Sequence, residues 1–211
     1  MKVLHIQSSP RGESSNSIAL TNAFIDACQS RDNSLVIDTL NVWNENLPEF
    51  DSEAIGAKYK AVKNESMTKR ESAVWRQVQA LIQRFQRADR IVLGSPMWNF
   101  APPYKLKQLI DLVAQRRYLF SYDGKQYGPM LNVAKAVAVY TRGSRFLEDS
   151  AIPARFDHQA PYIDFWLEFI GVQDLRSVVV DNAWNESAEE SARSLANGKA
   201  RLIGMTAWFL A

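Results

Sequence analysis

The stretch KVLHIQSSPRGESSNSIALTNAFIDACQ, residues 2–29, decides the fold. Residues 2–7 are mostly apolar and β-like, residues 16–29 place apolar side chains at helical spacing, and a hydroxyl-rich loop joins them. A strand that passes through a short polar loop into a helix is the first half of a βαβ unit. The sequence therefore predicts a parallel sheet covered by helices.

The rest of the chain repeats this alternation. Further strands are predicted at 35–40, 90–95, 135–140 and 175–181, and further helices at 68–87, 103–114, 161–170 and 187–210. Gly171 follows the helix at 161–170 and is expected to end it. These elements predict a three-layered, doubly wound α/β fold whose five parallel strands have the order 2-1-3-4-5.

Two features outside the strands also carry predictions. The last helix has a stripe that we expect to face the core, formed by Ala188, Ala192, Leu195, Leu202 and Phe209. The connections at 41–67 and 115–134 are long for a compact domain, and such connections usually carry function or cover a partner surface. The length of 211 residues predicts one domain over residues 1–211.

Composition excludes several classes of function. The net charge is only +2, which argues against a nucleic-acid binder. Cys28 is the only cysteine and there are two histidines, so we expect neither an intramolecular disulfide nor a zinc site. No apolar run reaches about 18 residues, and the first residues lack a signal-peptide core. We therefore expect a cytoplasmic protein without a membrane span or a bound metal.

The loop after the first strand, SSPRGESSNS, is the strongest local signal. Its polar side chains surround Gly12 just before a helix begins, and they are Ser8, Ser9, Ser14, Ser15, Asn16 and Ser17. Backbone N–H groups, hydroxyls and the helix dipole would then meet at one point, which suits a phosphate. From this loop alone, a turn that only caps the helix is an equally good interpretation. The dinucleotide fingerprint and the Walker pattern are absent here, and Cys28 lies inside the helix, which argues against a cysteine phosphatase.

The segment GSPMWNFAPPYKLKQLID, residues 94–111, begins at the carboxyl end of the third predicted strand. Ligands of open α/β sheets bind at this edge, where strands one and three lie side by side. Met97, Trp98 and Phe100 offer apolar or flat surface to a ring, and Asn99 can both donate and accept hydrogen bonds. These side chains are typical of a site for a heteroaromatic ring.

A second polar turn follows the fourth predicted strand. In YTRGSRF, residues 140–146, Thr141, Arg142 and Gly143 would lie beside the same ring. Taken alone, Arg142 is interpreted as a solvated loop charge. Cys28 and His5 are interpreted as buried, unreactive residues of the core.

These three segments, in this order and spacing, resemble the FMN-dependent NADH:azoreductase and quinone reductase family over nearly the whole chain. The resemblance implies a flavodoxin-like fold and a homodimer with one FMN per subunit, bound at the subunit interface. It implies NADH or NADPH as electron donor, and small quinone, azo or nitroaromatic compounds as acceptors. It also implies ping-pong turnover with no catalytic side chain, because the cofactor carries the chemistry.

The resemblance also assigns residues. The implied FMN-binding positions are Ser9, Ser15, Asn16, Ser17, Met97, Trp98, Asn99, Phe100, Thr141, Arg142, Gly143 and Ser144. Phe120 and Tyr122, in the long connection, and Phe169 resemble the walls of the family's acceptor pocket. The chain departs from the family at Thr141 and Ser144, where Ser and Gly are usual, and at Trp98, where Tyr is common. Arg116 and Arg117 replace small residues, so these departures bear on substrate range.

Two alternatives come from other classes of function. A flavodoxin-type electron carrier would use the same fold and cofactor, but such carriers tend to be strongly acidic and this chain has a net charge of +2. A domain that binds a phosphorylated ligand without turnover would use only the first loop.

Overall fold

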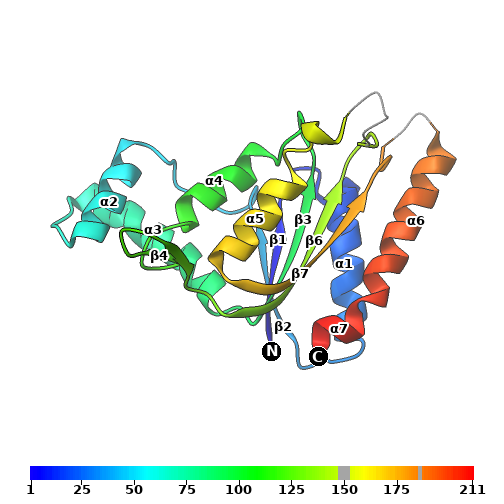
Figure 1. The fold of residues 1–211 in the computed structure, drawn as a ribbon, viewed down its shortest axis with the longest axis horizontal. Coiled ribbons are helices and arrows are strands. Elements are labelled where there is room, and N and C mark those ends of the chain that lie inside the picture. The colour runs from blue at the N-terminus through cyan, green and yellow to red at the C-terminus, as the bar shows by residue number, and fades with distance from the viewer. Residues whose placement is uncertain (147–152, 185–186) are drawn as a thin grey trace.

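Figure 1 shows the protein in a computed structural model that describes residues 1–146, 153–184 and 187–211. A five-stranded sheet has the order β2-β1-β3-β6-β7, and all its neighbouring strands are parallel. The strands are β1 (Lys2–Gln7), β2 (Val36–Asn41), β3 (Arg90–Pro96), β6 (Val133–Thr141) and β7 (Val172–Val180). Strands β4 and β5 form a separate hairpin, so β6 and β7 are the fourth and fifth strands of the main sheet. The predicted order 2-1-3-4-5 is therefore confirmed.

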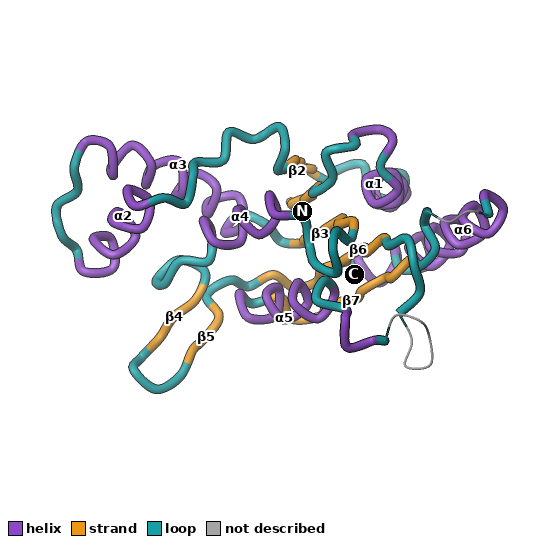
Figure 2. The backbone as a smooth tube through the Cα atoms, turned by 90° about the horizontal axis from the view of Figure 1, so that it is seen from above, coloured by secondary structure: helices purple, strands orange, loops and turns teal. Residues whose placement is uncertain are grey.

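Helices cover both faces of this sheet (Figures 1 and 2). One face packs against α1 (Asn16–Gln29), α6 (Ala188–Gly204) and α7 (Thr206–Leu210), and the other against α3 (Lys69–Gln86), α4 (Tyr104–Val113) and α5 (Ala160–Ile170). Alternate residues of each strand point to opposite faces and supply the two hydrophobic cores. Val3 belongs to the core on the α1, α6 and α7 side, and Leu4 to the core on the α3, α4 and α5 side. The three-layered, doubly wound prediction is confirmed.

Most element boundaries agree with the predictions within one or two residues. Helix α1 begins after Ser15, whose hydroxyl accepts a hydrogen bond from the Ile18 amide. Helix α5 ends at Gly171, as predicted, with φ at +120°. A Cβ at this position would lie 2.2 Å from the Leu131 carbonyl oxygen. The last strand begins at Val172 rather than residue 175, because the polar residues at its start lie on the edge of the sheet.

The two long connections contain elements that the pattern did not predict. Helix α2 (Ser52–Lys63) begins after Asp51, which accepts hydrogen bonds from two backbone amides, and packs on α3 rather than on the sheet. Lys60 of α2 is paired with Glu71 of α3, with Nζ 2.7 Å from Oε2. The second connection forms the antiparallel hairpin of β4 (Phe120–Tyr122) and β5 (Tyr127–Pro129).

The predicted helix at 187–210 is two helices, because α6 ends at Gly204 and α7 starts at Thr206. The predicted core stripe is correct at Leu202 and Phe209, which are buried, and Leu195 packs against the core from a partly buried position. It is wrong at Ala188 and Ala192, which are exposed. The first turns of α6 extend beyond the end of β7 (Figure 1), which leaves these alanines exposed. Across the described residues, no helix is both long and apolar enough to span a membrane.

Candidate cofactor site

The hydroxyl-rich loop lies at the carboxyl end of β1, above the start of α1. Ser9, Ser15 and Ser17 are buried, and the Ser15 and Ser17 hydroxyl oxygens are 3.1 Å apart. The loop is held from both sides: Ser8 donates its hydroxyl to the Gly94 carbonyl at 2.9 Å, and Asn16 donates its amide to the Ala183 carbonyl at 2.6 Å. Ser8 is therefore a support for the loop. The Ser15 and Ser17 hydroxyls share one hydrogen bond, in which either can be the donor, and Ser9 and Ser15 line the cavity described below.

Gly94 of β3 allows α1 to pack this closely. A Cβ at Gly94 would lie 3.0 Å from both the Ser17 carbonyl oxygen and the Thr21 methyl carbon. Beneath this contact His5 is buried, with Nε2 2.8 Å from the Thr21 hydroxyl oxygen, and burial lowers the pKa of its imidazole to about 4. Burial raises the pKa of the Cys28 thiol to about 11. The predictions of a buried His5 and a buried Cys28 are confirmed, and the raised pKa keeps the thiol protonated.

A cavity of about 200 Å³ opens beside the Ser9 and Ser15 hydroxyls of the loop after β1. Its lining comes from the loops after four strands: Ser9, Arg11, Ser15, Asn16, Pro96, Met97, Trp98, Thr141, Arg142, Gly143, Ala183 and Trp184. Arg11 is exposed and its side chain has no hydrogen bond or ion pair among the described residues. The cavity therefore offers buried hydroxyls, the N-terminus of α1 and one available guanidinium, which together suit a phosphate group.

The loop after β3 forms a tight turn at the rim of this cavity. Trp98 and Ala101 exchange both backbone hydrogen bonds, at 2.9 and 3.0 Å, and the residues between them, Asn99 and Phe100, have φ of 46° and 70°. Positive φ at both central positions is the geometry of a type I′ turn. The turn exposes the Asn99 and Phe100 side chains, while Trp98 packs on Trp43 with ring centroids 5.7 Å apart.

Two further hollows adjoin the first. A cavity of about 280 Å³ is lined by Met97, Asn99, Phe100, Arg142, Gly143, Ser144 and Phe146. A wider groove of about 730 Å³ extends along α4. It shares Trp98 with the first cavity and Asn99 with the second. Ser144 is not in the left-handed region of φ, so its Cβ causes no strain where the family usually has glycine. If a phosphate occupied the first cavity, the attached ring could extend into the second, which lies between the turn after β3 and the turn after β6.

Arg142 is buried, so the interpretation of its side chain as a solvated loop charge was wrong. Its side chain is only 8% exposed, with Nη1 2.8 Å from Asp157 Oδ2 and Nε 2.7 Å from Asp181 Oδ1. The Nε contact is an ion pair without hydrogen-bond geometry. Two carboxylates from distant segments balance the guanidinium, which explains its burial. Arg142 thus joins the turn after β6 to the segment before α5 and to the end of β7.

Gln159 is a second supporting residue that the sequence pattern did not reveal. It is fully buried, and its amide donates to the Ser95 carbonyl at 3.1 Å and to the Ser95 hydroxyl at 3.2 Å. Asp157 Oδ1 accepts hydrogen bonds from the amides of Gln159 and Ala160 at the start of α5. The His158 amide donates to the Phe100 carbonyl at 2.9 Å. The segment before α5 therefore fixes the turns that follow β3 and β6.

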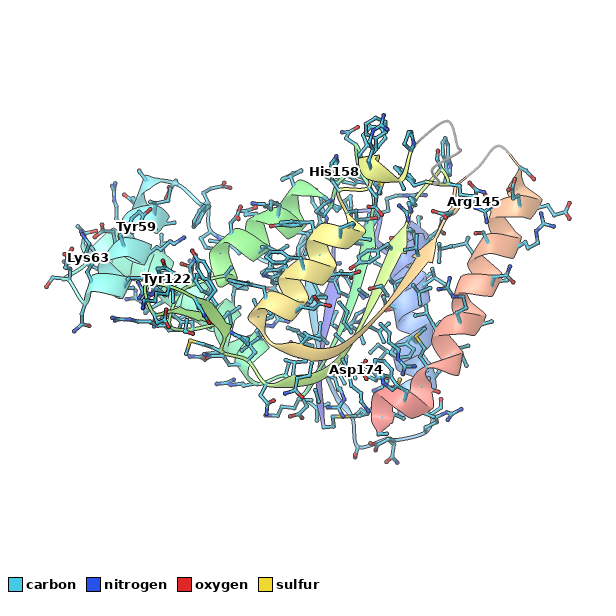
Figure 3. The ribbon with its side chains drawn as sticks, viewed as in Figure 1. Tyr59, Lys63, Tyr122, Arg145, His158 and Asp174 are labelled. Carbon is cyan, nitrogen blue, oxygen red and sulfur yellow. The ribbon has the colours of Figure 1, made fainter. Side chains whose placement is uncertain are left out.

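Phe120, Tyr122 and Phe169 do not line these cavities. With Tyr127 and Phe165 they form what we call the hairpin aromatic cluster, in which Tyr122 stacks on Tyr127 at 4.6 Å and Phe120 lies 5.0 Å from Phe169. Figure 3 shows Tyr122 on the hairpin, well separated from His158 beside the carboxyl ends of the strands. All of the residues predicted to bind a cofactor line the first cavity or the one of about 280 Å³, except Ser17, which is buried and hydrogen-bonded to Ser15. The predicted acceptor-pocket residues lie elsewhere on the subunit.

The fold and the site define a doubly wound α/β protein with a hydroxyl-lined cavity at the carboxyl edge of its parallel sheet. Residues 1–203 match the family described as having the flavodoxin-like fold. The FMN-dependent NADH:quinone oxidoreductase 2 of Burkholderia lata is 51% identical over 99% of this chain and 100% of its own. An FMN-dependent NADH:quinone oxidoreductase of Pseudomonas fluorescens is 38% identical over 92% and 95%. The chain belongs to the flavodoxin-like family and, within it, to the family of these quinone oxidoreductases.

Solved structures agree on the fold. An azoreductase from Bacillus anthracis has a TM-score of 0.88 at 21% identity, covering 98% of both chains. An FMN-dependent NADH-azoreductase from the same species, solved in complex with FMN, has a TM-score of 0.86 at 21% identity over 98% of this chain and 97% of its own.

Proposed function

We propose that this protein is an FMN-dependent oxidoreductase that passes electron pairs from NADH or NADPH to quinones and reductively cleaves aromatic azo compounds. One NADH and one proton reduce a quinone to a hydroquinone. Two NADH and two protons reduce an azo bond to two amines. The proposal rests on the family membership and on one structural observation: the hydroxyl-lined cavity at the start of α1 shares Met97, Arg142 and Gly143 with the hollow bounded by Asn99 and Phe100, and Trp98 with the groove along α4.

The hydrogen-bond donors that line the cavity fit FMN. Ser9, Ser15, the first amides of α1 and Arg11 would hold the phosphate, with Ser17 positioning the Ser15 hydroxyl through their hydrogen bond. The remaining proposed contacts to the ribityl chain and ring come from Asn16, Met97, Trp98, Asn99, Phe100, Thr141, Arg142, Gly143 and Ser144. Arg142 would act mainly by fixing the turn that contains it, because its charge is already balanced by Asp157 and Asp181.

Bound FMN would supply the electron-transfer chemistry itself. The chain would supply an apolar wall, through Met97, Trp98 and Phe100, and a donor and acceptor, through the Asn99 amide. Among the described residues lining the two inner cavities, Arg11 and Arg142 are the only ionisable ones. Neither is a general acid at neutral pH, so we propose that solvent provides the protons of the reduced acceptor.

We further propose a homodimer in which the hairpin aromatic cluster of one subunit completes the acceptor pocket of the other. Tyr127 and Phe165 are 63% and 60% exposed, and the hairpin projects beyond α5 (Figure 2). Contiguous exposed aromatics are typical of a protein interface. Because this cluster lies away from the cavities of its own subunit, Phe120, Tyr122 and Phe169 can serve as pocket walls only across an interface. Two-fold symmetry would place each cluster over the partner's site.

The flavin spectrum tests the proposal directly. The purified protein should show bound flavin absorbance, which NADH bleaches under anaerobic conditions and 1,4-naphthoquinone restores. A flavin that NADH does not bleach would favour an electron carrier, and a protein that binds no flavin would favour a non-catalytic phosphorylated-ligand domain. Parallel assays with NADPH, an azo dye and a nitroaromatic compound would define the range of donors and acceptors.

Kinetics would test the order of events. If donor and acceptor use the same hollow in turn, double-reciprocal plots at several acceptor concentrations should be parallel, as ping-pong turnover requires. Intersecting lines would indicate a ternary complex and contradict this part of the proposal.

We also propose that the protein works as a single domain in the cytoplasm.

A further inference from the structure

The base of the aromatic hairpin carries two arginines that the proposed site does not use. Arg116 donates to the Tyr122 carbonyl, and its guanidinium carbon lies 5.5 Å from the centre of the Tyr122 ring. Arg117 is exposed, and its backbone amide donates to the Phe120 carbonyl at 2.8 Å. Both arginines are thus attached to the segment that presents the hairpin aromatic cluster.

Arg117 is in an unusual backbone conformation. Its φ is +73°, in the left-handed region, which glycine adopts readily, asparagine adopts at times and most other residues avoid. Its side chain has no hydrogen bond or ion pair among residues 1–146, 153–184 and 187–211. Among the described residues, no hydrogen bond or ion pair of the Arg117 side chain offsets the strain of this conformation, and such strain is commonly found at functional positions.

The hairpin segment has more basic than acidic residues. Residues 116–129 contain Arg116, Arg117 and Lys125 and one acidic residue, Asp123, whose carboxylate accepts hydrogen bonds from the Lys125 and Gln126 backbone amides at 2.8 Å. Asp123 is thereby tied to the turn at the far end of the hairpin. The exposed Glu168 of α5 is the acidic residue next to the cluster in sequence. At the base of the hairpin, the backbone of Arg117 is bonded to that of Phe120, a ring of the cluster, and the Arg117 side chain is exposed.

We propose that Arg117 selects acceptors that carry a sulfonate or carboxylate on an aromatic ring, with Arg116 adding to the positive charge. This inference rests on the proposed function and on the proposed homodimer. The rings of the cluster would stack on the flat acceptor, and a guanidinium would pair with its anionic substituent. Arg117 would act as a specificity residue, without taking part in electron transfer.

The test compares a matched pair of acceptors, 1,4-naphthoquinone and 1,4-naphthoquinone-2-sulfonate, with NADH as donor. The measured quantity is the ratio of kcat/KM for the sulfonate to kcat/KM for the neutral quinone. Intrinsic reactivity cancels when this ratio is compared between variants. In Arg117→Asn the ratio should fall about threefold, the middle of the range for exposed charge interactions. Arg117→Glu should lower it further, and Arg117→Lys should largely retain it.

Two further measurements separate specificity from a structural role. Asparagine tolerates the left-handed conformation, so Arg117→Asn should melt at the same or a higher temperature than the parent. The ratio of the parent should also decrease as ionic strength rises, because salt screens the exposed charge. Arg31→Asn, a substitution of an exposed arginine just after α1, is the matched control and should leave the ratio unchanged.

The outcomes are distinguishable. If the parent reduces both quinones and the ratio is the same in Arg117→Asn and Arg117→Glu, the inference is wrong while the proposed function stands. If the parent reduces neither quinone, the proposed function fails and this inference fails with it.

Discussion

Nη1 of Arg142 lies 2.8 Å from Oδ2 of Asp157, and this pair joins the turn after β6 to the start of α5. Both side chains are largely buried, at 8% and 14% exposure. A buried ion pair loses more when one partner is removed than an exposed pair does, because the remaining charge stays away from water. The interaction therefore bears on stability as well as on the shape of the site.

The variant Asp157→Asn should lower the free energy of unfolding by about 2 kcal/mol, since Asp181 still balances part of the Arg142 charge. Urea unfolding of the FMN-free protein measures this. Arg70→Gln removes an exposed pair with Glu53, 3.5 Å apart, and serves as the control, with an expected change below ~0.5 kcal/mol. Equal effects of the two substitutions would show that the burial of Arg142 has no energetic weight.

Arg11→Gln should weaken FMN binding about tenfold and leave riboflavin binding unchanged, because a charge-assisted contact to the phosphate would be lost. Riboflavin lacks the phosphate, so the difference between the two ligands isolates that contact. Flavin fluorescence quenching on addition of FMN-free protein gives both affinities. Arg31→Gln is the matched control. A parallel loss of affinity for riboflavin would place Arg11 at the ring or in a structural role instead.

His5 should make the protein less stable in acid. Its folded pKa of about 4 lies below the ordinary value of 6.5, so the unfolded chain takes up the proton first as pH falls. The contribution is complete above pH 6.5 and is lost progressively toward pH 4, by roughly 3 kcal/mol in total. Urea midpoints across this range should therefore show a shallower pH dependence in His5→Asn than in the parent.

Gly171→Ala should destabilise the protein by ~3 kcal/mol, since the new Cβ would lie 2.2 Å from the Leu131 carbonyl oxygen at a φ of +120°. Gly124→Ala offers the comparison, because its φ is +101° but no atom lies within 4 Å of the added Cβ. There the cost should be about 1 kcal/mol, from backbone strain alone. Thermal unfolding of both variants checks the order, and a larger effect at Gly124 would contradict it.

Phe165→Asp should convert the proposed dimer into a monomer, since it buries a carboxylate in an apolar interface. Phe165 is 60% exposed within the subunit, so the fold should persist. Light scattering after size-exclusion chromatography measures the mass, and quinone turnover should fall with it while FMN stays bound. Ile203→Asp, at an exposed position of α6, is the control. A dimeric, fully active Phe165→Asp protein would refute the proposed interface.

The sequence was most informative where local chemistry sets the structure. Ser15 caps α1 and the hydroxyls around it are local, so both the helix and the phosphate loop were predictable. Arg142 was not, because the carboxylates that bury it, on Asp157 and Asp181, come from segments distant in sequence. Helix α2 escaped prediction because it buries only two small residues, Ala54 and Ala57. The turn at Asn99 and Phe100 lacks the glycine that usually reveals a type I′ turn.

The tryptophans around the cavity have an optical consequence. Trp98 lines the cavity and packs against Trp43, while Trp184 lies at its rim with 76% of its side chain exposed. Indole emission overlaps the near-ultraviolet absorbance of flavin, so excitation energy absorbed by these rings would pass to a nearby cofactor instead of being emitted. The protein thus contains intrinsic fluorophores on two sides of its site, and loading of the site can be followed without any added dye.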